Sequence, residues 1–128
     1  MKGTEKQVKW AQDIQNGIFQ ALDAKIADLT AKMEATSEKL ANLTPEIEAK
    51  HPRRRNSFQT RIDGNLRDIA QLEAGKTYFE RLFAVPFFQD AHNVIEKRRY
   101  FCADFAVTDA LDMSADEWEK RIASWAAL

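Results

Sequence analysis

Apolar residues near the start of the chain recur at intervals of three and four positions, as one buried face of a helix requires. This face consists of Val8, Ala11, Ile14, Ile18 and Leu22. The four residues before it, TEKQ at positions 4–7, have the form of a capping box, with Thr4 as N-cap and Gln7 reaching back to it. The pattern therefore predicts a helix that begins directly after Thr4.

Two heptad patterns follow, separated by a short polar segment. The first consists of Leu22, Ile26, Leu29, Met33, Thr36, Leu40 and Leu43, with Thr36 as its one polar member. The second consists of Phe58, Ile62, Asn65, Ile69, Leu72, Lys76, Phe79 and Phe83, in which Gly64 and Gly75 can interrupt the helix. Alternating spacings of three and four are typical of a coiled-coil seam. We therefore predict an antiparallel, coiled-coil-like hairpin in which residues 20–43 pair with residues 56–80.

The tip of this hairpin is expected at residues 44–55. Thr44-Pro45 should end the first helix and can cap a short new one, since proline is favoured at the first helical position. His51-Pro52 breaks the chain again, and Asn56 or Ser57 is expected to cap the second long helix. A helix over residues 5–43 would be about 58 Å long, whereas a compact domain of this size has a radius of gyration of about 14 Å. Either the first helix bends near Gly17 or the hairpin projects from the body.

Aromatic residues locate that body in the second half of the chain. Of the 13 aromatic residues, 11 lie at or after position 58, and the stretch 78–88 is dense enough to form core. Pro86 should end one helix and help to start the next, whose expected apolar face is Ala91, Val94, Ile95, Tyr100, Phe101 and Phe105. A last helix begins with a second capping box at Ser114 and carries Trp118, Ile122 and Trp125 on one face. The prediction is one all-α domain over residues 1–128 with about four to six helices, its body formed by residues 78–128 together with residues 4–19.

Charge and cysteine content narrow the class of protein. The formal net charge is −1, from 19 basic and 20 acidic residues, so no overall field attracts nucleic acid or an anionic membrane. Cys102 is the only cysteine, which excludes an internal disulfide and fits a reducing compartment. No apolar run approaches the roughly 20 residues that a bilayer requires, and the first residues do not resemble a signal peptide. We expect a cytoplasmic protein with no membrane contact.

A basic cluster at the predicted tip is the sharpest local feature. Arg53, Arg54, Arg55 and Arg61 lie within nine residues that contain no acid. A positive charge at the start of a helix interacts unfavourably with the helix dipole, which indicates that these arginines have a role other than stabilising the helix. A solvated turn, or pairing with the nearby Glu46 and Glu48, is the favoured interpretation; the alternative is an anionic partner, either an acidic protein surface or nucleic acid.

Lys97, Arg98 and Arg99 form a second basic cluster just before Tyr100-Phe101. Interleaved basic and aromatic residues can bind single strands by stacking. The two aromatic residues also fit the apolar face of a helix, and this core interpretation is favoured, with the three basic residues exposed.

Residues that could support catalysis or metal binding are sparse. His92 and Glu96 have the spacing of two ligands on one helix face, but nothing completes a coordination shell. Cys102 lies about three helical turns from His92 and is flanked by Phe101 and Phe105, which indicates a buried, inert thiol. There is no glycine-rich phosphate loop. We predict neither an enzyme nor a cofactor.

The three tryptophans, Trp10, Trp118 and Trp125, lie near the two ends of the chain. The favoured interpretation is that they pack the terminal helices together. The alternative is that one of them, foremost Trp125, anchors a partner, since tryptophan is enriched at interface hot spots.

The opening segment GTEKQVKWAQDI at positions 3–14 resembles a segment near the start of many uncharacterised proteins of phages, plasmids and integrated elements, which follows roughly T/S-E-K-Q-I-x-W-A-E-D-I. The match covers about a tenth of the chain, and Gln12 replaces the usual acid. The resemblance implies a mobile-element accessory protein, a group that includes small helical inhibitors of host defence. The segment itself is expected to be a capped helix start whose Val8, Trp10, Ala11 and Ile14 pack inward.

These observations favour a non-enzymatic protein-binding module, in its concrete form an inhibitor of a host defence nuclease of the anti-CRISPR kind. The alternative is a nucleic-acid-binding helical protein that uses the arginines of residues 53–61. Self-association through the heptad positions is compatible with both. The expected contact residues are Arg53, Arg54, Arg55, Arg61, Lys97, Arg98, Arg99 and Trp125.

Overall fold

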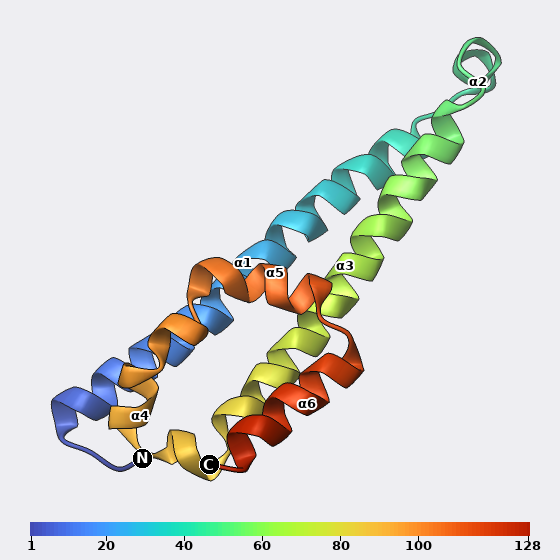
Figure 1. Cartoon of the computed structure of the whole chain (residues 1–128). Coiled ribbons are helices and arrows are strands. Elements are labelled where there is room, and N and C mark those ends of the chain that lie inside the picture. The colour runs from blue at the N-terminus through green and yellow to red at the C-terminus, as the bar shows by residue number, and fades with distance from the viewer.

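The computed structural model describes all 128 residues as helices joined by short turns (Figure 1). The six α-helices are α1 (Glu5–Ala41), α2 (Pro45–Lys50), α3 (Arg54–Phe83), α4 (Ala91–Glu96), α5 (Ala103–Asp112) and α6 (Ala115–Ala126). Two short 3₁₀ helices, η1 (Pro86–Gln89) and η2 (Arg98–Tyr100), flank α4. There is no strand beyond a single bridge between Lys2 and Asp90. The predicted all-α class with four to six helices is confirmed.

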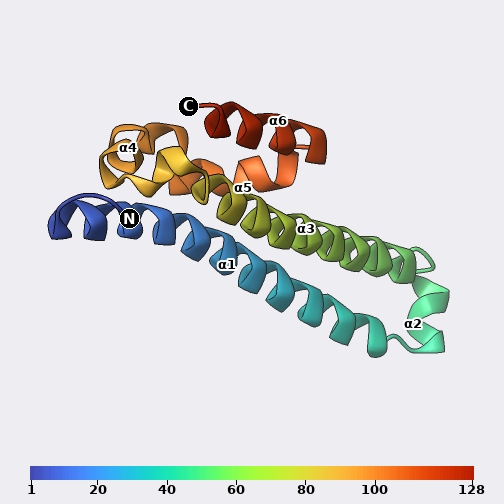
Figure 2. The ribbon, with the colours of Figure 1, turned by 90° about the horizontal axis from the view of Figure 1, so that it is seen from below.

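The predicted hairpin is formed by α1 and α3, which run antiparallel and contact each other along the molecule, with α2 at the tip (Figures 1 and 2). Leu22, Leu29, Ile62 and Leu72 are buried members of the two heptad patterns. Further toward the tip the seam is only half-buried, because two helices alone cannot surround it. The half of the hairpin farther from α2, which we call the base, therefore has a buried seam, whereas the half next to α2 has a seam that is only partly buried.

The hairpin projects, and α1 does not break at Gly17. α1 is one helix of 37 residues, about 55 Å long at 1.5 Å per residue. α3 likewise continues through Gly64 and Gly75, the two positions at which an interruption was expected. The length of the first helix left two alternatives, a bend near Gly17 or a hairpin that projects from the body. The structure has the second, and we call the projecting part of the hairpin the arm (Figure 2).

Capping interactions set the helix boundaries near the tip. As predicted, Pro45 begins α2 and the Thr44 hydroxyl accepts a hydrogen bond from the Ile47 amide at 3.2 Å. The expected cap at Asn56 or Ser57 is wrong, since α3 begins earlier, at Arg54. Arg53 occupies the N-cap position without a side-chain hydrogen bond, and the Arg54 amide donates to the His51 carbonyl at 3.1 Å. The turn after Pro52 thus leads directly into the helix and leaves the arginines in its first turn.

A second layer made of η1 to α6 covers the base of the hairpin. α5 contacts both α1 and α3, α6 lies along α3, and α4 lies against α1 (Figure 1). The single helix expected after Pro86 is wrong, because the chain turns at Lys97 and again at Phe101, which ends η2. This second turn directs Phe101 into the core but leaves Tyr100 58% and Phe105 63% exposed, although both were expected on the apolar face.

The core sits where this layer meets the hairpin. Phe79, Phe83, Phe88, Phe101 and Trp118 are buried there and meet largely edge to face, at centroid distances of 4.9–6.0 Å within the cluster. The dense aromatic stretch at 78–88 is therefore core, as predicted. None of the helices is both long and apolar enough to cross a bilayer.

The start of α1 follows the prediction except at one residue. Thr4 and Gln7 form the capping box, and Ala11 is fully buried. Trp10 was expected to pack inward but is 48% exposed, with the Arg98 guanidinium 5.2 Å from its ring centroid. Because neighbouring helical residues point about 100° apart, burying Ala11 turns Trp10 to the edge of the interface.

Candidate functional site

The tip of the hairpin carries an open groove in the region where α2, the turn after it and the start of α3 meet. Its lining residues are Lys50, His51, Pro52, Arg53, Arg54, Ser57, Phe58 and Arg61, and it has a volume of about 540 Å³. We call this set the tip groove. Three of the four arginines that the sequence singled out, Arg53, Arg54 and Arg61, line it together, joined by Lys50.

The charge of the tip groove is uniformly positive. Lys50, Arg53, Arg54 and Arg61 contribute four fixed positive charges, and no acidic residue lines the groove. None of these four side chains forms an ion pair within the chain, and all four are exposed. Clustered cations repel one another, so an arrangement without internal counter-charges favours an external anion.

Arg55 belongs to a different environment although it lies beside Arg54 in the sequence. Its guanidinium pairs with the Glu48 carboxylate of α2, and it does not line the groove. Pairing with a nearby acid, one of the two interpretations of the basic cluster, therefore holds for Arg55. The structure divides the arginine run into one residue that ties α2 to α3 and two that face the groove.

Basic residues continue from the tip groove onto the sides of the arm. Arg61 also borders a depression between α1 and α3 that includes Lys32 and Lys39, together with Asp68. Arg54 and Phe58 border another that includes Lys39, Leu43 and Ile47. Lys32 is paired with Asp28 at 3.1 Å. The sides of the arm are therefore mixed in charge, unlike the groove itself.

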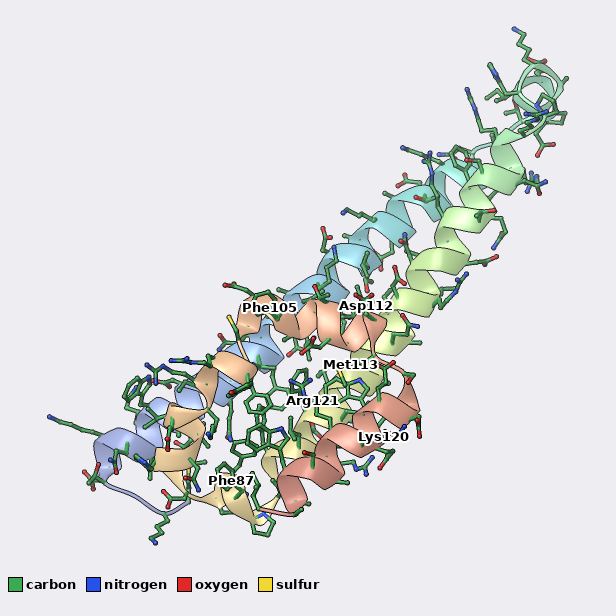
Figure 3. The ribbon with its side chains drawn as sticks, viewed as in Figure 1. Phe87, Phe105, Asp112, Met113, Lys120 and Arg121 are labelled. Atoms are coloured by element: carbon green, nitrogen blue, oxygen red, sulfur yellow. The ribbon has the colours of Figure 1, made fainter.

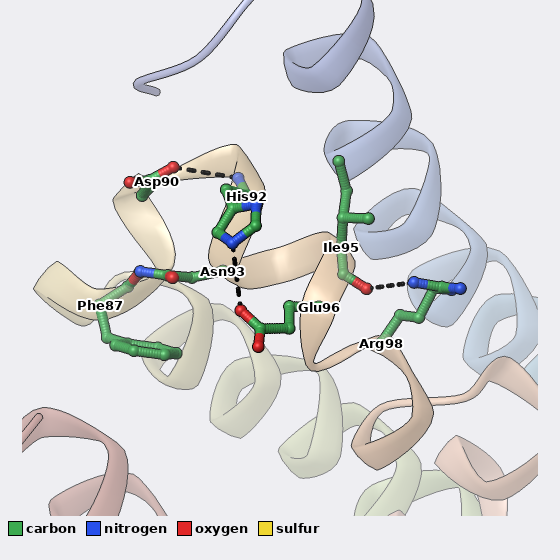
Figure 4. Close-up of polar contacts among 7 residues, drawn as sticks. All are labelled: Phe87, Asp90, His92, Asn93, Ile95, Glu96 and Arg98. Atoms are coloured by element: carbon green, nitrogen blue, oxygen red, sulfur yellow. Dashed lines mark hydrogen bonds and ion pairs between the residues drawn. The ribbon is translucent and has the colours of Figure 1, made fainter.

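The second basic cluster lies at the opposite end of the molecule, around α4 and η2 (Figure 1). Arg98 donates to the Ile95 carbonyl at 2.6 Å, as Figure 4 shows, and its guanidinium also covers Trp10. Arg99 is exposed and Lys97 is half-buried. The fold does not bring Lys97, Arg98 and Arg99 into one site with the tip arginines.

Trp125, the tryptophan named as the alternative anchor for a partner, is half-buried within the protein. Its ring lies 5.0–6.0 Å from the ring centroids of Phe87, Phe88, Tyr100 and Phe101. This is the core interpretation of the tryptophans. The exposed large aromatic residues are instead Trp10, Tyr100 and Phe105, the last at the start of α5 (Figure 3).

His92 and Glu96, the two candidate metal ligands, make local structural contacts. His92 Nε2 lies 3.2 Å from the Glu96 carboxylate, and the Asp90 carboxylate accepts a hydrogen bond from the His92 amide at 3.0 Å (Figure 4). No group of three His, Cys, Asp or Glu side chains could hold a metal ion. Cys102 was expected to be buried and inert between Phe101 and Phe105; it is only partly buried, at the N-cap of α5, and Phe105 is exposed.

Arg121 is the contact residue that sequence reasoning missed. It donates to Asp109 Oδ2 at 3.1 Å and to the Tyr100 carbonyl at 3.0 Å, and its guanidinium lies 5.1–5.8 Å from the rings of Trp118, Phe101 and Phe79. Figure 3 shows it between α5 and α6 near Met113. Its spacings of three from Trp118 and four from Trp125 were the available indications that it shares the buried face. Arg121 is a structural residue of the base.

Comparison of the chain with protein-family models, curated proteins and solved structures gives no match.

Proposed function

We propose that this chain is a non-enzymatic protein-binding module whose projecting hairpin presents the tip groove to an acidic surface of a partner protein. The observation that carries the proposal is the groove itself, with four cationic side chains, no acid and no internal ion pair. Its position at the end of a long arm leaves it open to a large partner (Figure 2). Guanidinium groups bind carboxylates through paired, charge-assisted hydrogen bonds, which suits them to this role.

The concrete form of the proposal is an inhibitor of a host defence nuclease, encoded by a phage or another mobile element and acting in the cytoplasm. The N-terminal segment at positions 3–14 supports this origin, and the single cysteine fits a reducing compartment. Carboxylates hold the divalent metals of many nuclease centres. An arginine-rich tip is complementary in charge to such a surface.

Nucleic acid is the second candidate partner, and the continuation of basic residues toward Lys39 and Lys32 favours it. A strand following the arm would contact these lysines as well as the groove. Its affinity should fall by about 0.9 log unit per log unit of salt for each duplex phosphate neutralised. Salt-independent binding to duplex DNA would rule this candidate out.

An affinity capture from host lysate tests the proposal. Tagged wild-type protein and a variant with Arg53, Arg54 and Arg61 replaced by alanine are compared, each with and without nuclease treatment. We expect a protein retained in near-stoichiometric amount by the wild type after nuclease, and lost from the triple variant. Circular dichroism should show equal helicity, since all three side chains are exposed. Recovery that disappears with nuclease would favour nucleic acid, and equal recovery by both forms would place the interface elsewhere.

A further inference from the structure

The tip groove combines two kinds of surface. Arg53, Arg54 and Arg61 supply charge, whereas Pro52 and Phe58 supply apolar area. Phe58 is half-buried, and it also borders the depression formed by Leu43 and Ile47. A ligand that offered only charge would leave the apolar part of the groove exposed to water.

We infer that the tip groove binds a short extended peptide segment of the partner in which one apolar side chain is flanked by carboxylates. This inference rests on the proposed function and names the chemistry of the surface that the arm contacts. The apolar side chain would cover Phe58 and Pro52, and the carboxylates would pair with the surrounding guanidinium groups. Charge complementarity selects the ligand, because the groove contains no acid that would repel carboxylates.

The dimensions of the groove set the length of the segment. Arg54 and Arg61 are seven residues apart on α3, which corresponds to about 10 Å along the helix. An extended peptide advances about 3.3 Å per residue. Carboxylates about three to four residues apart therefore reach both arginines, and a segment of about five residues spans the groove.

A peptide fits the apolar part of the groove better than a nucleic-acid base does. Single-strand binders stack bases on the open faces of aromatic rings. Phe58 is the only Phe, Tyr or Trp side chain of the groove, beside the smaller imidazole of His51, and the residues around Phe58 partly bury it. A partly buried ring can contact a leucine-sized side chain, but it does not present the open face on which a base would stack.

Synthetic probes test this inference without knowledge of the partner. The first is the peptide Asp-Glu-Leu-Asp-Glu, the second has serine in place of leucine, and the third is an oligothymidylate of equal net charge. Binding is followed by amide chemical-shift changes in the full-length protein up to millimolar ligand, which detects weak complexes. We expect shifts confined to residues 50–61, with the leucine peptide binding several-fold more tightly than the serine peptide.

Matched variants separate the groove from general positive charge. Arg54→Ala should weaken the leucine peptide by about tenfold or more, since it removes a charge-assisted contact. Arg67→Ala removes the same charge further along α3, outside the groove, and leaves the Arg55–Glu48 pair that joins α2 to α3 in place. It should change the affinity less than threefold. Equal losses in Arg54→Ala and Arg67→Ala would overturn the inference.

Two further outcomes of the probe experiment would overturn the inference. Tighter binding of the oligothymidylate than of the leucine peptide would assign the groove to nucleic acid, and no binding of any probe would overturn the peptide site. Both results are independent of the outcome of the capture experiment. A protein retained by the wild type and lost from the triple variant would leave the proposed function standing while the peptide inference fails.

Discussion

Glycine occupies three positions inside the two long helices, and each has different surroundings. A Cβ added at Gly17 or at Gly64 would meet nothing within 4 Å. At Gly75 it would lie 2.5 Å from the Cβ of Ala110, so α3 and α5 approach each other there through the missing side chain. The sequence marked all three as helix-weakening residues but could not distinguish the one that tertiary packing requires.

Alanine substitutions should therefore have opposite effects at these positions. Gly17→Ala and Gly64→Ala are expected to raise the free energy of unfolding by up to about 1 kcal/mol each, because alanine has the higher helix propensity. Gly75→Ala should lower it, by about 1–3 kcal/mol, since the added methyl overpacks the α3–α5 contact. Urea denaturation of the three variants measures this, and a stabilised Gly75→Ala would contradict the packing described here.

Substitution of Arg121 should lower the stability of the protein more than substitution of most other charged residues. Its side chain is only 18% exposed and joins Asp109, the Tyr100 carbonyl and three aromatic rings. Arg121→Ala is expected to cost about 2–4 kcal/mol, because it leaves the half-buried Asp109 without its partner and removes the stacking. Arg99→Ala, an exposed control, should change stability by less than about 0.5 kcal/mol. Similar thermal midpoints for the two variants would show that Arg121 does not hold the base together.

Single residues also limit what can be predicted from the sequence. Trp10 and Phe105 are exposed although their residue types favour burial, and Arg121 is partly buried although its type favours exposure. Each outcome depends on where a neighbouring element packs. A heptad or helical pattern indicates which side of a helix is buried, but not where that burial ends.

At the scale of elements, long and strongly periodic segments were predictable and short ones were not. The helices with many periodic apolar positions, α1, α3 and α6, follow from the sequence, as do both capping boxes. The segment 86–105 contains enough apolar residues to suggest one helix, yet it folds as two 3₁₀ helices and α4 before α5 begins. The turn at Phe101 arises because burying this ring among Phe83 and Phe88 outweighs local helix formation.

The docking of α6 on α3 includes an ion pair that should make stability depend on pH. Two Arg81 nitrogens donate to the Glu119 carboxylate, at 2.6 and 2.9 Å. This hydrogen bonding holds the pKa of Glu119 below its ordinary value of 4.5. Because the folded-state pKa is depressed, the contribution is complete above pH 4.5 and is lost as the pH falls through the folded pKa.

Glu119→Gln tests this dependence. The variant should be less stable than the wild type at neutral pH, and the difference should shrink as the pH is lowered below 4.5, where the wild-type carboxylate becomes protonated. Because both side chains are about half exposed, the difference should also decrease with added salt. Unfolding curves at several pH values measure it, and a difference that grows on acidification would have the wrong sign.

At the scale of the whole molecule, burial is concentrated at one end. The base contains the aromatic core, whereas α2 has no buried residue. Amide hydrogens of α2 and of the first turns of α3 should therefore exchange through local opening, well before those around Phe79 and Trp118. Hydrogen exchange read by mass spectrometry checks this, and uniform protection along the hairpin would contradict it.

The projecting arm and its basic tip could be anticipated from heptads, prolines and the arginine run. What could not be anticipated is the division of that run, in which Arg55 turns toward Glu48 while Arg53 and Arg54 face the groove. That division depends on the placement of α2 relative to the start of α3, which no local pattern specifies. Self-association through the heptad positions stays a prediction.

The central claim is that the partner lies in the tip groove, and site-specific photo-crosslinking tests it most directly. A photoreactive amino acid replaces Ser57, which lines the groove, or Gln20, an exposed residue of α1 nearer the base. In nuclease-treated host lysate we expect a discrete protein adduct from position 57 and none from position 20. An adduct formed from position 20 alone, or only nucleic acid captured from position 57, would contradict the account.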